Sequence, residues 1–237
     1  MIGEYGVYVP GAAPPDARTT GAVAAATGLS AVDARLILTA PFPKKVAAED
    51  SAEGAAARVR ALREAGLEAF VVTNDALRGA RAPRLSGFRL DGGRVIFEPG
   101  ADDFRPRLVV RGLIRKSVRV DQKRVVHVQG VPRLERVRGT PTTGAEPFLR
   151  LYGESYADAF EIRPSSFNFR ALGGRFQSTT AGNVSALLEL LGDVRVDDTL
   201  TRASLPPETE GQEVVRESDE EAAMRTATLI AVDLLRR

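Results

Sequence analysis

The chain has 237 residues, an apolar fraction of 43% and a formal net charge of +2, which suits one or two domains with hydrophobic cores. It contains no cysteine and a single histidine, His127, which argues against disulfides, thiolate or multi-histidine metal sites, and Ser-His or Cys-His nucleophiles. No apolar run approaches about 18 residues, and the N-terminus lacks a basic, apolar leader, so we expect no transmembrane segment, no signal peptide and a cytoplasmic protein.

Residues 4–73 predict a small three-stranded sheet covered by three helices, in the order β-α-α-β-α-β. Gly28 separates the first helix from the second, and Ser30 is a typical helix-capping residue. A short strand and an alanine-rich third helix follow, and Gly66 ends that helix before a buried strand at 67–72. The apolar residues expected in the core of this domain are Leu29, Ile37, Val59, Leu62 and Val71.

This stretch also carries a run of family landmarks: Thr-Gly-Leu at 27–29, an acidic-Ala-basic-apolar run at 33–38, a Pro-x-Pro turn with two lysines at 41–45, and Leu-x-Glu-Ala-Gly at 62–66. In these features it resembles the C-terminal domain of the bacterial ribosomal stalk protein, a factor-docking domain that performs no chemistry and is related in fold to the Clp-protease adaptor for N-terminal degrons. Val32 departs from the family pattern, which commonly has an exposed lysine there, and a glycine expected after the short strand is missing. The resemblance implies partner contacts at Val32, Arg35, Lys44 and Lys45; alternatively, Arg35 is only a solvated helix residue and the lysines only a charged turn.

The middle of the chain predicts a linker at 76–86 and a mostly antiparallel β domain at 87–193. Asp91-Gly92-Gly93 predicts the turn of a β-hairpin over 88–98. We expect further strands at 107–111, 112–120, 124–129, 148–152, 159–163 and 167–171, and a helix at 183–191 capped near Thr179 or Thr180 and ended by Gly192. We interpret this order as a small barrel or roll closed by a helix, an order similar to bacterial pleckstrin-homology-like domains, and the fold class as α+β.

The last part, 194–237, predicts an acidic arm followed by an amphipathic helix at 220–235 that Ser218 or Asp219 caps. The apolar positions of this helix are Ala223, Ala227, Ile230, Leu234 and Leu235. An isolated helix of this length is marginal in water, so we expect it to dock on a folded domain, within the chain or across a homodimer.

Charge is segregated along the chain. Residues 105–138 hold eleven basic side chains against two acidic ones, whereas 193–221 holds ten acidic against three basic. The basic run predicts an anion-binding surface for nucleic acid or anionic lipid, with Arg111, Arg115, Lys116, Arg119, Lys123 and Arg124 as the candidate residues. The alternative is a solvated sheet face that the acidic arm covers within the chain.

The sequence shows no recognisable catalytic constellation and no nucleotide-binding glycine motif of the correct spacing. Gly173-Gly174-Arg175 precedes a helix, but it reads as a plain turn with a helix cap. We therefore expect a non-enzymatic protein-protein adaptor or scaffold that needs no cofactor or metal. The alternative function is an anion-binding module that uses the basic run.

Overall fold

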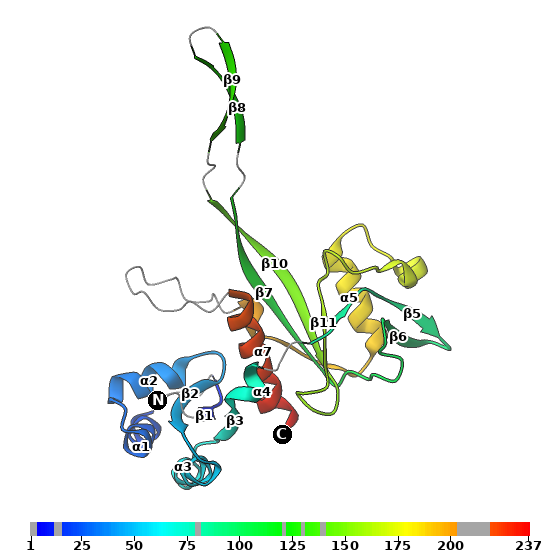
Figure 1. The fold of residues 1–237 in the computed structure, drawn as a ribbon. Coiled ribbons are helices and arrows are strands. Elements are labelled where there is room, and N and C mark those ends of the chain that lie inside the picture. The colour runs from blue at the N-terminus through cyan, green and yellow to red at the C-terminus, as the bar shows by residue number, and fades with distance from the viewer. Residues whose placement is uncertain are drawn as a thin grey trace.

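The computed structural model describes residues 4–11, 16–78, 82–119, 122–128, 131–137, 141–202 and 219–237, with the backbone alone at 78, 202 and 219 and in the described part of 115–143. The protein is α+β, as the sequence predicts (Figure 1).

A small antiparallel sheet near the N-terminus has the strand order β2-β1-β3. Its strands are β1 (Tyr5–Val9), β2 (Lys44–Glu49) and β3 (Phe70–Thr73). One face of the sheet packs against the helices α1 (Ala17–Thr27), α2 (Ala31–Thr39) and α3 (Ala52–Glu64). The predicted order of elements is therefore confirmed. Of the predicted core residues, Val59 and Leu62 are buried, and Leu29, Ile37 and Val71 are partly buried against them.

Local capping explains where these helices begin and end. Asp16 accepts a hydrogen bond from the Thr19 N–H at 2.6 Å at the start of α1, and Gly28, with φ of 75°, ends that helix in the left-handed conformation that glycine tolerates best. At the start of α3, the Ser51 hydroxyl accepts from the Gly54 N–H at 3.1 Å. These caps determine where α1 begins and ends and where α3 begins.

The second sheet has five strands in the order β12-β7-β10-β11-β4. The long strands β7 (Leu108–Arg119) and β10 (Pro141–Tyr152) pair antiparallel over their full length. Shorter strands flank them: β11 (Ala159–Ile162), β4 (Arg84–Leu85) and β12 (Arg195–Asp198), which continues into α6 (Thr199–Arg202). Two hairpins complete the β structure, β5 (Gly87–Asp91) with β6 (Arg94–Glu98), and β8 (Gln122–Val128) with β9 (Val131–Val137).

The expectation of a barrel is wrong, because the described strands form an open sheet from which β7, β10 and the β8–β9 hairpin project as a two-stranded ribbon (Figure 1). The sequence gives a reason. Beyond Ile114, β7 continues as Arg-Lys-Ser-Val-Arg, in which neither set of alternate residues is consistently apolar. The sequence therefore does not favour packing of a second sheet or a helix on this part of the strand.

Several element boundaries also differ from the predicted ones. The two strands expected at 107–111 and 112–120 are the single strand β7, and β9 was not expected. Residues 167–171, expected as a strand, give a bridge at Asn168 and the start of the 3-10 helix η1 (Arg170–Arg175). The predicted linker contains the end of α4 (Asn74–Arg78) and β4, and the start of the predicted acidic arm forms β12 and α6, whereas 203–218 lies outside the described residues.

The two faces of the five-stranded sheet carry separate hydrophobic cores. On one face, Val109, Leu149 and Leu151 pack with the β5–β6 hairpin and with α5 (Thr180–Leu191), a helix that Thr179 caps and Gly192 ends as predicted. On the other face, Leu108, Val110 and Phe148 meet α7 (Asp219–Leu235). Gly112 is needed there, because a Cβ atom at this position would lie 2.5 Å from the Phe148 ring.

Helix α7 lies between the two sheets (Figure 1). Its buried residues Ala223, Ala227, Ile230 and Ala231 pack on β7 and β10 of the second sheet. From another side of the helix, Leu229 packs with Tyr8, Phe70, Val72 and Leu77, on the face of the N-terminal sheet that α1–α3 leave open. The surface that this helix needs is therefore supplied by its own chain, and its apolar residues are covered without a second copy.

Substitutions at two adjacent residues of α7 test whether the helix packs on both sheets. Leu229 faces the N-terminal sheet and Ile230 faces the second sheet, with side chains 5% and 4% exposed. We predict that Leu229→Ala and Ile230→Ala each lower the free energy of unfolding by about 2–5 kcal/mol, as measured by urea denaturation. The matched control is Leu90→Ala, at a position 43% exposed, which should cost about 0.5 kcal/mol or less. If only one of the two α7 substitutions is costly, the helix packs firmly on one sheet alone.

Candidate functional site

Helix α2 presents two large apolar side chains to solvent. Val32 is 69% exposed and Leu36 is 65% exposed, and they lie one helical turn apart on the same face. The opposite face of the helix is fully buried through Ala34 and Leu38. Helix α2 is thus apolar on both sides, and only one side has a partner among the described residues.

The position of this face is fixed by the chain on either side of it. The Ser30 hydroxyl accepts from the Asp33 N–H at 3.1 Å and donates to the Asp33 carboxylate at 2.7 Å, which caps α2. Helices α1 and α2 meet at a bend of 114°. At the far end, the Thr39 hydroxyl donates to the Arg35 and Leu36 carbonyls at 3.1 Å, which satisfies acceptors in the last turn of the helix.

The structure brings some of the predicted contact residues together. Arg35 lies on α2 beside Val32 and Leu36, is exposed, and forms no ion pair with any described residue. Lys44 and Lys45 follow on β2, an edge strand that contacts α2. Lys45 is exposed.

Lys44 is more enclosed than a free surface cation. It is half-buried, with its ammonium 4.3 Å from the centre of the Phe42 ring, and desolvation lowers its pKa. Leu36 was not predicted as a contact residue, although its spacing of four from Val32, opposite Ala34 and Leu38, was a usable signal in the sequence.

The basic residues of the second predicted site are spread along the ribbon. Arg111 is half-buried in β7, and Arg115, Lys116 and Arg119 follow along the same strand. Lys123 and Arg124 are on β8, opposite Arg136 and Glu135 respectively, and His127 is opposite Pro132. The side chains from 115 to 143, and the acidic residues 203–218 expected to cover them, lie outside the described part of the structure.

A separate group of charged side chains, in which Arg163 and Glu161 are buried, lies where α7 begins. The Arg163 guanidinium, 4% exposed, pairs with Glu161 and Glu220 at 2.5 Å and with Glu146 at 3.5 Å. Arg84 also pairs with Glu161 at 3.0 Å and with Glu220 at 2.8 Å. Because Glu220 belongs to α7 and Glu161 to β11, this network ties the helix to the second sheet.

The neighbouring buried groups have limited chemistry. Burial raises the pKa of Tyr152 to about 12, so its hydroxyl stays protonated near neutral pH.

Among the described residues, no group of three or more His, Cys, Asp or Glu side chains is placed to hold a metal ion. In the same residues, no single helix is long and apolar enough to cross a membrane, and α1 with α2 reaches that length and composition only across their 114° bend.

Comparisons of the chain with protein-family models, with curated proteins and with solved structures find no match.

The buried network should matter more for stability than exposed ion pairs of similar number. We predict that Arg163→Met lowers the free energy of unfolding by about 3–5 kcal/mol, because Glu161 would then keep a buried charge with its main partner removed. The matched control is Arg89→Met, whose side chain is 52% exposed and has three carboxylates at 3.3–3.8 Å; it should cost about 0–1 kcal/mol. Urea denaturation measures both, and equal losses would contradict a stabilising role specific to the buried group.

Proposed function

We propose that this chain is a cytoplasmic, non-enzymatic adaptor that docks a protein partner on the outward face of α2. The observation that carries the proposal is the pair Val32 and Leu36, more exposed than any other large apolar side chains in the described residues. Arg35 beside them favours a partner element that presents apolar side chains next to a carboxylate. The adaptor needs no cofactor or metal for this role.

The order of elements supports the same proposal. Residues 4–73 fold in the order β-α-α-β-α-β, which the resemblance to the ribosomal stalk domain implies. That family docks factors through helix surfaces, and Val32 and Arg35 occupy matching positions in this chain. Val32 makes the surface more apolar than the family pattern, so we expect a different partner.

The size of the patch sets the expected strength of binding. Full burial of a Val or Leu side chain contributes on the order of 1.5–3 kcal/mol, and association itself costs several kcal/mol. Two such residues and one arginine therefore suit a transient contact, unless the partner extends onto neighbouring elements such as β2 with Lys45.

A photo-crosslinking amino acid, p-benzoylphenylalanine, placed at Leu36 in the intact chain tests this proposal in cells of the source organism. We expect a discrete crosslinked protein. Excess unlabelled wild-type chain should abolish this crosslink by competition, whereas excess Val32→Asp, Leu36→Asp double variant should not. Arg35→Glu should weaken the competition several-fold, because it reverses the charge beside the patch.

The control places the same crosslinker at Leu90, which is 43% exposed on the β5–β6 hairpin. Identical products at both positions, or none at Leu36, would reject docking on α2.

A second candidate function is anion binding by the ribbon. The observation that favours it is that the basic run lies on a projecting two-stranded ribbon and not on one wall of a closed barrel (Figure 1). The basic residues are distributed along the strands of this ribbon, and a run of like charge attracts nucleic acid or an anionic membrane.

Binding to single-stranded oligonucleotides and to phosphatidylserine vesicles across a salt series tests the ribbon. If it binds anions, charge reversal at Arg115, Lys116 and Arg119 should weaken binding and lower the magnitude of the salt slope by about 1 per phosphate contact removed. The matched control reverses three exposed arginines elsewhere, Arg94, Arg170 and Arg175, and should have little effect. No affinity at low salt, or equal effects of both triple variants, would reject this function.

A further inference from the structure

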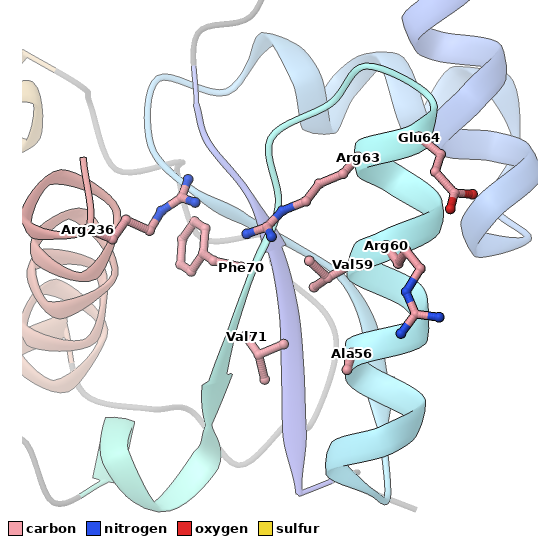
Figure 2. Close-up of a pocket in the computed structure, with 8 residues that line it drawn as sticks. All are labelled: Ala56, Val59, Arg60, Arg63, Glu64, Phe70, Val71 and Arg236. Atoms are coloured by element: carbon pink, nitrogen blue, oxygen red, sulfur yellow. The ribbon is translucent and has the colours of Figure 1, made fainter.

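A groove runs along the free edge of β3, at the opposite end of the N-terminal sheet from β2. Figure 2 shows α3 on one side of it and the C-terminal end of α7 on the other. Its volume is about 630 Å³, and its lining includes Val59, Arg60, Arg63, Phe70, Val71 and Arg236. No residue of the α2 face belongs to it.

The floor of this groove is an open strand edge. Strand β3 is the last strand of its sheet and pairs only with β1. The Asn74 N–H donates to the Glu4 carbonyl at 2.9 Å, so the backbone groups of 72 and 74 face β1, and those of 69, 71 and 73 face outward by alternation. The Arg63 guanidinium donates to the Ala69 carbonyl at 3.1 Å, which agrees with this direction.

Val71 therefore offers an N–H and a C=O to the groove with no strand beside them among the described residues. Unpaired edge groups of this kind are the usual template for adding a strand from another chain.

Cations line the rim. Arg60 and Arg63 lie one turn apart on α3, both exposed, and Arg60 forms no ion pair with any described residue. Across the groove, the Arg236 guanidinium lies 4.7 Å from the centre of the Phe70 ring (Figure 2).

The nearby carboxylates are mostly engaged. Asp233 and Glu68 are held by Arg236 and Arg237 at 2.6–3.4 Å, so Glu64 is the acid that remains beside Arg60 and Arg63. The side of the groove formed by α3 thus favours a ligand with negative charge.

We propose that the β3 edge binds an extended, acidic segment of a partner protein as a fourth strand of the N-terminal sheet. Side chains three residues apart on a helix are about 5–6 Å apart, and alternate residues of a strand are about 6.7 Å apart, so successive carboxylates on one face of the added strand can meet Arg60 and Arg63. The intervening residues then face the side of the sheet that carries Phe70 and Arg236. A free phosphate or a nucleic acid would use the arginines but would leave the outward groups of Val71 unpaired.

The test uses the intact chain and a fluorescein-labelled heptapeptide, Val-Glu-Val-Glu-Val-Glu-Val, in fluorescence anisotropy. We expect saturable binding that weakens about tenfold or more with Val71→Pro, which removes the outward N–H but leaves the pairing with β1 intact. The Arg60→Glu, Arg63→Glu double variant should weaken it at least as much. The lysine counterpart of the peptide should not bind, and Val32→Asp with Leu36→Asp should not matter, which separates this edge from the α2 site.

Two N-methylated peptides make the test independent of protein folding. One carries N-methyl groups at every valine and the other at every glutamate, and only one of these two sets can face β3 in an added strand. Strand addition predicts that one isomer keeps its affinity and the other loses it.

Absence of saturable binding at low salt, or equal binding of both isomers, would overturn the proposal. Binding of a thymidine decanucleotide that depends on Arg60 and Arg63 but is unchanged by Val71→Pro would reassign the groove to simple anions.

Discussion

The rest of the structure depends on the burial of α7 against two sheets at once. A sheet with helices on one face needs cover on the other if that face is apolar, and Tyr8, Phe70 and Val72 make the second face of the N-terminal sheet apolar. The same helix covers Phe148 and its neighbours on the second sheet. Alanines at the contact let the helix approach closely, and the ion pairs at its two ends fix its position along both sheets.

This arrangement determines which surfaces remain available for partners. Because α7 occupies the open face of the N-terminal sheet, that face is covered within the chain, whereas the outward side of α2 and the free edge of β3 are left uncovered by it. The first is apolar with one arginine, and the second is a strand edge between arginines. The ribbon of β7 and β10 projects from the second sheet (Figure 1), so three chemically different surfaces are presented by one chain.

Features encoded by local signals could be predicted from the sequence, whereas those set by long-range packing could not. The caps at Ser30 and Thr179 and the glycines at 28 and 192 were predicted correctly as helix boundaries, because each acts within one turn. Strand β9, which was not expected, contains Pro132; a two-stranded hairpin tolerates a proline there, because no third described strand needs an N–H from that position. Residues 167–171 were expected to form a strand, but the Phe167 ring stacks on Phe88 with centroids 6.0 Å apart and meets the Phe169 ring edge-on at 4.9 Å.

The candidate site shows the same difference between local signals, which the sequence contains, and long-range contacts, which it does not reveal. Val32 and Arg35 could be named from family landmarks, whereas Leu36 was not named, although its spacing of four from Val32 places both residues on one face of α2. The groove beside β3 could not be found in the sequence, because it joins α3, a strand edge and the last turn of a helix about 165 residues further along the chain.

Native-state hydrogen exchange with mass spectrometry tests the central claim that α7 couples the two sheets into one cooperative unit. The account predicts that amides of β3, α7 and residues 108–114 exchange with a common free energy of opening. It also predicts that Ile230→Ala, which alters the contact with the second sheet, lowers the protection of β3 by as much as that of β7. If β3 keeps its protection while β7 loses its own, the two sheets are independent and α7 does not couple them.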